Sequence, residues 1–132
     1  MVYKVLVADD EQVLRSLAVA YLELLTSEGY DIQTLEAKDG IEALRIISEQ
    51  AGQGHGLDLV VSDVNMPGKT GIDVLVQGKQ ISPNTGFVIW SGRIQAYEDE
   101  VKQHGGTPLG KPVRIETFLQ AVKTYLKPSS GA

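Results

Sequence analysis

Tyr3-Lys-Val-Leu-Val-Ala-Asp-Asp10 opens the chain with a short apolar run that ends in two adjacent carboxylates. Residues 57–63, Leu-Asp-Leu-Val-Val-Ser-Asp, have the same arrangement and end in a third carboxylate. Short runs rich in Val and Leu are typical of strands that are buried on both faces of a parallel sheet. The carboxyl ends of such strands meet at one edge, where ligands bind in open α/β sheets. We therefore expect Asp9, Asp10 and Asp63 to lie together at that edge.

Strand-like and helix-like segments alternate along the rest of the chain. Further strands are predicted at residues 31–36, 87–90 and 107–110. The spacing of apolar residues predicts helices at about 11–27, from 40 to the glycine-rich 51–56, through 72–76, at 93–104 and at 115–126. The helix at 93–104 has few apolar anchors and is expected to be the least firmly packed. Strict alternation favours an α/β fold, a five-stranded parallel sheet with helices on both faces.

Size and composition indicate one domain, at residues 1–127, followed by a linker stub or free tail at 128–132. The net charge of −5 argues against direct binding to nucleic acid, because phosphate contacts reward clustered Lys and Arg. The chain has no cysteine, which excludes disulfides and thiol catalysis. It has no apolar stretch near the roughly 18 residues of a membrane span, and no secretory signal is visible. We expect a cytoplasmic protein without a membrane segment.

Each acidic site has an ordinary structural explanation that must be weighed against a functional one. Asp9 and Asp10 lie between a strand and a helix, where one acid is common as a helix cap. Two adjacent carboxylates are harder to explain without a cation, because like charges held this close repel each other. Asp63 is followed by a loop containing Asn65 and Pro67 rather than by a helix start. Three carboxylates, a loop carbonyl and waters make an oxygen cage that suits Mg²⁺, and a carboxylate can also accept a phosphoryl group.

Two more polar residues follow predicted strands at the same edge. Ser91 comes directly after the strand at 87–90, where its hydroxyl could donate to a phosphoryl oxygen. Lys111 follows the strand at 107–110, where an ammonium would offset carboxylate charge and bind a phosphoryl group. The Lys111-Pro112 bond is a candidate for the cis form, which would help to aim the lysine.

These motifs together resemble the receiver domain of bacterial two-component response regulators. The resemblance rests on the acids in Val7-Ala-Asp-Asp-Glu11, on Asp63 in Ser62-Asp-Val-Asn-Met-Pro-Gly68, on Ser91 and on Lys111-Pro112. It covers about residues 3–127, with each motif in order. It implies a flavodoxin-like, doubly wound sheet with strand order 2-1-3-4-5 and five helices.

The resemblance also implies roles for the site residues. Asp63 would accept a phosphoryl group from the phosphohistidine of a sensor histidine kinase or phosphotransfer protein. Asp10, Asp63 and the backbone carbonyl of Asn65 would bind Mg²⁺, with Asp9 acting through water. Lys111 would contact the phosphoryl group, and Ser91 would form a hydrogen bond to it. The charge of the phosphoryl group would then shift the equilibrium of a two-state element, here the segment at 93–110.

One position departs from the family pattern. Receivers usually carry an aromatic residue three positions before the lysine, where its ring turns as the hydroxyl residue moves. Here that position is Pro108, which has no such side chain. Tyr97 is the alternative candidate for this role. Arg93, two residues after Ser91, lies where it could influence access to the phosphoryl group.

An alternative function is a Mg²⁺-dependent phosphohydrolase that works through an aspartyl phosphate. Such enzymes place a general acid two residues after the nucleophile, and here that residue is Asn65, which cannot act as one. We therefore predict a signalling module rather than an enzyme. The cognate kinase, the downstream effector protein or output domain, and the choice between a monomer and a homodimer stay open at this stage.

Overall fold

The computed structural model describes residues 2–126, so the predicted tail at 128–132 lies outside the described residues. Its sheet is parallel, with strand order β2-β1-β3-β4-β5. The strands are β1 (Val2–Ala8), β2 (Asp31–Ala37), β3 (Leu59–Asp63), β4 (Gly86–Ser91) and β5 (Thr107–Gly110). This order confirms the expected doubly wound fold. It also makes direct neighbours of β1, which Asp9 and Asp10 follow, and β3, which ends in Asp63.

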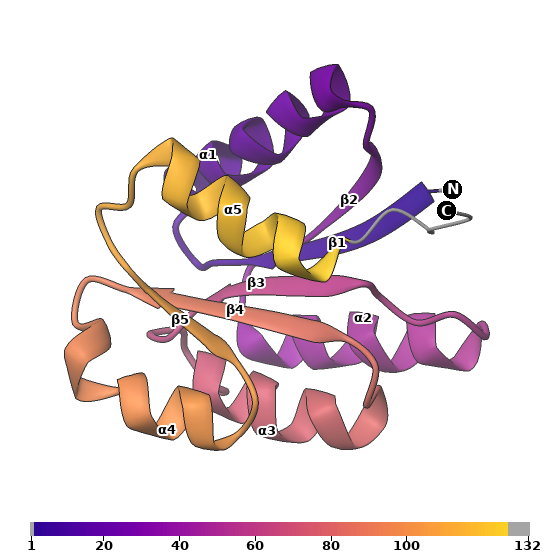
Figure 1. Cartoon of the computed structure of the whole chain (residues 1–132). Coiled ribbons are helices and arrows are strands. Elements are labelled where there is room, and N and C mark those ends of the chain that lie inside the picture. Colours follow the sequence, from indigo (N-terminus) through magenta and orange to yellow (C-terminus); the bar gives the residue numbers. More distant parts are fainter. Residues whose placement is uncertain (1, 127–132) are drawn as a thin grey trace.

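Helices cover both faces of the sheet (Figure 1). The helices are α1 (Gln12–Glu23), α2 (Gly40–Gly52), α3 (Gly71–Ile81), α4 (Glu98–Gln103) and α5 (Ile115–Tyr125). Helices α1 and α5 lie on one face, and α2, α3 and α4 lie on the other. Within residues 2–126 we find no helix with the length and apolar character needed to cross a bilayer.

The hydrophobic core has two parts because successive strand side chains point to opposite faces. Val5, Val7, Leu59 and Val61 pack toward α1 and α5 with Phe118. The residues between them pack toward α2, α3 and α4. Strand β3 is buried along its whole length, as expected for a central strand with an unbroken apolar sequence. Asp63 therefore lies at the end of a strand that is buried along its whole length, as β4 also is.

Two predicted helices are shorter than expected. The segment predicted as one helix at 11–27 ends its α-helical part at Glu23 and continues as a 3₁₀ turn, η1 (Leu24–Glu28), closed by Gly29 at φ 92°. The segment at 93–104 breaks into a 3₁₀ turn, η2 (Ile94–Ala96), and the six-residue α4. Val101 is the one fully buried side chain in these two elements. Weak apolar anchoring explains the break.

Pro108 lies in β5, an edge strand, without disturbing the sheet. The Lys111 amide donates to the Ser91 carbonyl at 3.0 Å, so by strand alternation Thr107 and Leu109 also direct their backbone groups toward β4. Pro108 then has its backbone nitrogen on the open edge, where a missing N–H breaks no ladder bond. The strand is thus compatible with proline and its outer edge is a poor template for another strand.

The packing of α5 on β4 yields a stability prediction at Gly86. A Cβ at this residue would lie 2.1 Å from the Cδ1 atom of Tyr125, whose hydroxyl bonds Thr107. We expect Gly86→Ala to destabilise the fold by about 1–3 kcal/mol because the ring must move. Urea unfolding followed by circular dichroism measures this. The control Gly52→Ala, with no atom within 4 Å, should keep wild-type stability or gain up to about 1 kcal/mol. Equal stability of the two variants would contradict this packing.

Candidate functional site

Strand register brings two of the predicted acids level with each other. Strands β1 and β3 pair with Ala8 opposite Ser62, so continuing by one residue places Asp9 level with Asp63. Val5 and Val7, like Leu59 and Val61, face α1 and α5, and the same alternation puts Asp9 and Asp63 on that face. The sheet itself therefore sets the spacing of these two carboxylates.

Asp9 is fully buried and each of its polar atoms has a partner. Its amide donates to the Ala37 carbonyl at 3.1 Å, and its own carbonyl accepts from Arg15 Nη1 at 2.7 Å. Its Oδ1 accepts from the Glu11 amide at 2.9 Å, and its Oδ2 lies 3.3 Å from Lys111 Nζ. Asp9 thus folds its own loop instead of capping α1, whose N-cap residue has no side-chain bond.

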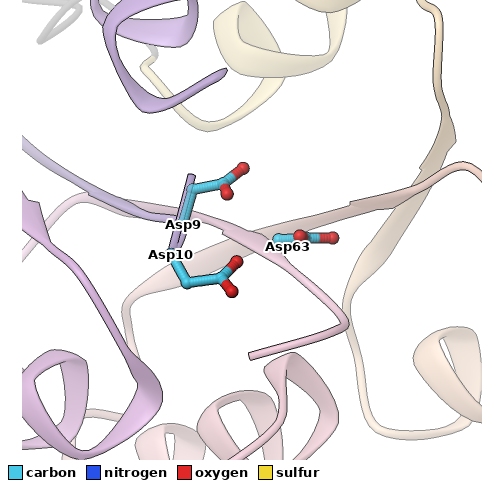
Figure 2. A group of neighbouring side chains, drawn as sticks. All are labelled: Asp9, Asp10 and Asp63. Atoms are coloured by element: carbon cyan, nitrogen blue, oxygen red, sulfur yellow. The ribbon is translucent and has the colours of Figure 1, made fainter. Parts of the chain in front are cut away.

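Asp10 and Asp63 complete an acidic cluster. One carboxylate oxygen from each of Asp9, Asp10 and Asp63 lies within 4.8 Å of the others. Figure 2 shows the Asp9 and Asp10 side chains extending from the end of β1 toward the side of Asp63. Asp10 is exposed, whereas the other two are buried, so the cluster opens to solvent on one side. Hard carboxylate oxygens open to water are the donor set that Mg²⁺ accepts, and these residues fit such an ion.

Lys111 lies between the two buried acids. Its Nζ is 3.3 Å from Asp9 Oδ2 and 3.6 Å from Asp63 Oδ1, and its side chain is only 16% exposed. A buried carboxylate without a partner is strongly unfavourable, so this ammonium offsets part of the cost of burying Asp9. The structure therefore brings together four of the predicted site residues: Asp9, Asp10, Asp63 and Lys111.

The surroundings of Asp63 act on its pKa in opposite directions. Burial raises the pKa of the Asp63 carboxyl above its ordinary value of 3.8, and the nearby Asp9 charge raises it further. The Lys111 ammonium and hydrogen bonds from the Val64 and Asn65 amides lower it. Burial is the largest effect, so the pKa of Asp63 is raised overall. Lys111 and the two amides therefore do not fully offset the cost of burying the Asp63 carboxylate.

The loop after Asp63 is fixed by the start of α3. The Gly71 amide donates to the Val64 carbonyl at 2.8 Å, and a Cβ at Gly71 would lie 2.1 Å from the Asp63 carbonyl oxygen. Only glycine permits this close approach. The Thr70 hydroxyl and the Asp73 carboxylate form a reciprocal capping box that holds α3 in place. Asn65 is exposed within this loop, beside the acidic cluster.

The remaining predicted residues lie at the same edge. Ser91 is 1% exposed, and its Oγ accepts from the Arg93 amide at 3.0 Å. A hydroxyl that accepts this bond still has its own proton to donate. The Lys111-Pro112 bond is cis. Pro108 pairs with Ile89 in the β4–β5 register and contributes no side chain to the acidic cluster.

Two contributors were not predicted from the sequence. Arg15 binds the Asp9 carbonyl and also pairs with Glu36 of β2 at 3.0 Å, which braces the acidic loop from α1. Its signal was a cation one turn after Glu11. Trp90 lies opposite Asp63 in the β3–β4 register, and its ring centroid is 4.7 Å from Lys111 Nζ. Sequence placed Trp90 next to Ser91 but could not reveal its contact with Lys111.

The chain is similar to known proteins along most of its length. A family model described as the response regulator receiver domain matches residues 5–123. Sporulation initiation phosphotransferase F of Bacillus subtilis is 32% identical over 93% of each chain. The receiver domain of the hybrid histidine kinase CckA is 35% identical, with a TM-score of 0.70 over 94% of this chain and 99% of that one. A response regulator receiver domain protein from Clostridium thermocellum is 28% identical, with a TM-score of 0.77 over 94% of each chain.

Other relatives are longer than this chain. The transcriptional regulatory protein AruR of Pseudomonas aeruginosa is 34% identical over 96% of this chain but only 50% of its own length. The chain thus spans about half the length of this relative and nearly all of the sporulation phosphotransferase.

The raised pKa of Asp63 predicts a pH-dependent stability. The folded state keeps the Asp63 proton to a higher pH than the unfolded state does, so this residue lowers stability as pH rises above 3.8. Without divalent cations, we expect Asp63→Asn to unfold at a higher temperature than wild type at pH 7. The gap should shrink as pH falls toward 3.8.

Thermal unfolding followed by circular dichroism between pH 4 and 8, with a chelator present, measures this dependence. The control Asp31→Asn, at an exposed residue that opens β2, should unfold close to wild type at each pH. An Asp63→Asn midpoint below that of wild type at pH 7 would contradict the proposed balance of burial against Lys111.

Proposed function

The chain belongs to the response regulator receiver domain family, and from this premise we propose that it accepts a phosphoryl group on Asp63. The carboxylate of Asp63 attacks phosphorus, a P–O bond forms, and the P–N bond of the donor phosphohistidine breaks with its electron pair returning to the imidazole. The observation that supports this role is the position of Asp63 at the end of β3, buried yet beside a lysine and two further acids. Phosphoryl transfer needs positioning and charge neutralisation above all.

The chain's own groups prepare Asp63 for this reaction. Attack requires the ionised carboxylate, which Lys111 and the Val64 and Asn65 amides favour against the effect of burial. The Lys111 ammonium, 3.6 Å from Asp63 Oδ1, could donate a hydrogen bond to a phosphoryl oxygen once transfer has occurred. Gly71 and its capping box keep the carboxylate from shifting while the donor approaches. These groups would let the domain catalyse its own phosphorylation from a donor, and we propose that it likewise catalyses its own dephosphorylation, as a signalling module rather than an enzyme.

Asp10, Asp63 and the Asn65 carbonyl would hold Mg²⁺, with Asp9 acting through water. Bound Mg²⁺ would supply positive charge to the phosphoryl oxygens. The opening of the cluster at the exposed Asp10 gives a hydrated cation access from solvent. Asp9, committed to Lys111 and Glu11, is less free to coordinate directly.

Ser91 would report the phosphoryl group. Its Oγ already accepts from Arg93, so its proton remains to donate to a phosphoryl oxygen. Movement of Ser91 would pull on η2, α4 and β5, where Val101 is the one fully buried side chain. With Pro108 in place of an aromatic rotor, residues 93–110 would respond through backbone shifts, and Tyr97, which packs on the core beneath α4, is the ring closest to this role.

The phosphodonor protein would dock beside Lys111. A pocket of about 340 Å³ is lined by Leu14, Leu17 and Tyr21 of α1, by Trp90, and by the segment 111–113. Val13, one turn before Leu17, is 80% exposed. This apolar surface, the α1 patch, adjoins the phosphoryl site, so a helix that carries a phosphohistidine and apolar neighbours could bury it while reaching Asp63. A histidine kinase or phosphotransfer protein in the cytoplasm would meet this description.

The output is left to a partner protein or to a further domain. The sporulation relative has almost the same length as this chain, whereas AruR, named as a transcriptional regulator, is about twice as long. The net charge of −5 favours protein contacts over direct nucleic-acid binding by this domain. The phosphohydrolase alternative finds no support in the comparisons. Such an enzyme would need a general acid two residues after Asp63, and Asn65 at that position cannot act as one.

The phosphoacceptor assignment predicts the result of labelling with a small donor. With Mg²⁺ and acetyl phosphate, intact-mass spectrometry should show one added phosphoryl group in wild type and none in Asp63→Asn. A chelator should abolish the labelling. The control Asp58→Asn changes an acid just before the same strand, whose Oδ2 accepts from the Lys4 amide, and should be labelled like wild type. Absence of any mass gain in wild type would refute the proposal.

The docking assignment predicts a change that affects only the protein donor. Leu17→Glu puts a charge on the α1 patch, where Leu17 is 41% exposed, and should slow transfer from a phosphorylated kinase at least about tenfold. Labelling by acetyl phosphate should be unchanged. The matched control is Leu24→Glu in η1, at a residue 48% exposed and outside the patch. A kinase panel assayed by radiolabel transfer measures both variants, and equal slowing in the two would place docking elsewhere.

A further inference from the structure

Lys111 has a third contact besides its two carboxylates. Its Nζ lies 4.7 Å from the centroid of the Trp90 ring. A cation this close to the face of an indole is attracted by the ring quadrupole, and tryptophan is the strongest of the aromatic residues in this respect. The ammonium is therefore held between Asp9 and Asp63 and the face of an aromatic ring.

Trp90 is itself held rigidly. It is 2% exposed, pairs with Asp63 across the β3–β4 register, and its backbone carbonyl accepts from the Val64 amide at 3.3 Å. Its ring packs on Phe118 of α5 with centroids 5.3 Å apart. Because the Trp90 ring is fixed on the strand next to that of Asp63, we expect it to move little when Asp63 is modified. Lys111, by contrast, has a long stem that needs such a surface to stay aimed.

The indole is present despite an unsatisfied donor. Among residues 2–126, Trp90 Nε1 is the one buried side-chain nitrogen or oxygen that has no hydrogen-bond partner. A buried donor without a partner is unfavourable, and an apolar side chain at this position would carry no such donor. Core packing alone therefore does not account for a tryptophan here. Its stronger attraction for a cation does.

We propose that Trp90 is a positioning residue that holds the Lys111 ammonium at Asp63. When Asp63 carries a phosphoryl group, the ammonium exchanges its contact with Asp63 Oδ1 for a phosphoryl oxygen, while the indole keeps it at the site. The pocket residues beside the lysine stem are apolar, and the Lys111 side chain is only 16% exposed, so little water screens this attraction. The proposal rests on the proposed phosphoacceptor function and adds to it a residue that acts through Lys111.

A spectroscopic test judges the contact without any phosphorylation. Protons over an indole face are shielded by its ring current, so the Lys111 ε-methylene resonance should lie upfield of other lysines in wild type. Loss of the signal in Lys111→Arg identifies it. It should return to the ordinary lysine position in Trp90→Leu and stay partly shielded in Trp90→Phe. An unshielded resonance in wild type would overturn the proposal.

A kinetic test then judges the role. With Mg²⁺ and acetyl phosphate, the rate of labelling followed by intact mass should fall about threefold to tenfold in Trp90→Leu, and less in Trp90→Phe, which keeps an aromatic face. In a Lys111→Met background, Trp90→Leu should cause no further slowing. The control Leu22→Ala removes a fully buried side chain from the same core cluster and should label at the wild-type rate.

The outcomes separate the two proposals. Equal slowing by Trp90→Leu in both backgrounds, or slowing by Leu22→Ala as well, would mean that Trp90 acts only as core and would overturn its positioning role. If Trp90→Leu does not fold, the comparison of Trp90→Phe with wild type, in both backgrounds, decides the same question. If wild type is not labelled at all, the phosphoacceptor function fails, and the Lys111 resonance alone decides whether the indole holds the ammonium.

Discussion

The Lys111 ammonium lies 3.3 Å from Asp9 and 3.6 Å from Asp63, and this contact links the ends of β1, β3 and β5. Without it, the fully buried Asp9 carboxylate would lose the cation that is paired with it, which a protein interior tolerates poorly. Lys111 does not fully offset the burial of Asp63, because the pKa of the Asp63 carboxyl is still raised overall. In the function that we propose, Asp63 accepts the phosphoryl group, and the groups that would bind this group and a cation already surround it.

The two buried acids, Asp9 and Asp63, have different contacts and therefore different roles. Asp9 uses its amide, its carbonyl and both side-chain oxygens to build the loop and to anchor the lysine. Asp63 is held mainly by backbone, with Val64 and Asn65 amides below it and Gly71 against its carbonyl. Its carboxylate is thus held in place while the side of the cluster at Asp10 stays open to solvent. Both side-chain oxygens of Asp9 are thus used in structural contacts, whereas the Asp63 side chain lies beside the open side of the cluster.

The β5 edge of the sheet, where we propose that the response occurs, is less buried than the strand that carries Asp63. Strand β3 is wholly buried, whereas β5 is an edge strand and α4 is a helix of six residues with one fully buried side chain. Elements with few buried contacts open at low free-energy cost. Pro108 fits the outer edge of β5 because no ladder bond is lost there, yet it offers no ring to turn. The response proposed for residues 93–110 therefore rests on backbone shifts and on α4, with Tyr97 as the candidate ring.

The alternation of strands and helices and the acids after Ala8 and Ser62 were legible in the sequence, because each depends on local periodicity and on the rule that parallel strands end at one edge. The family resemblance supplied the strand order. Helix lengths were overestimated at 11–27 and 93–104, since periodicity does not register how weakly a segment is anchored. Tertiary structure alone decided that Asp9 anchors Lys111, that Arg15 braces the acidic loop, and that Trp90 faces the ammonium. These contacts join residues far apart in the chain, and their geometry follows from strand register and packing, which no local pattern encodes.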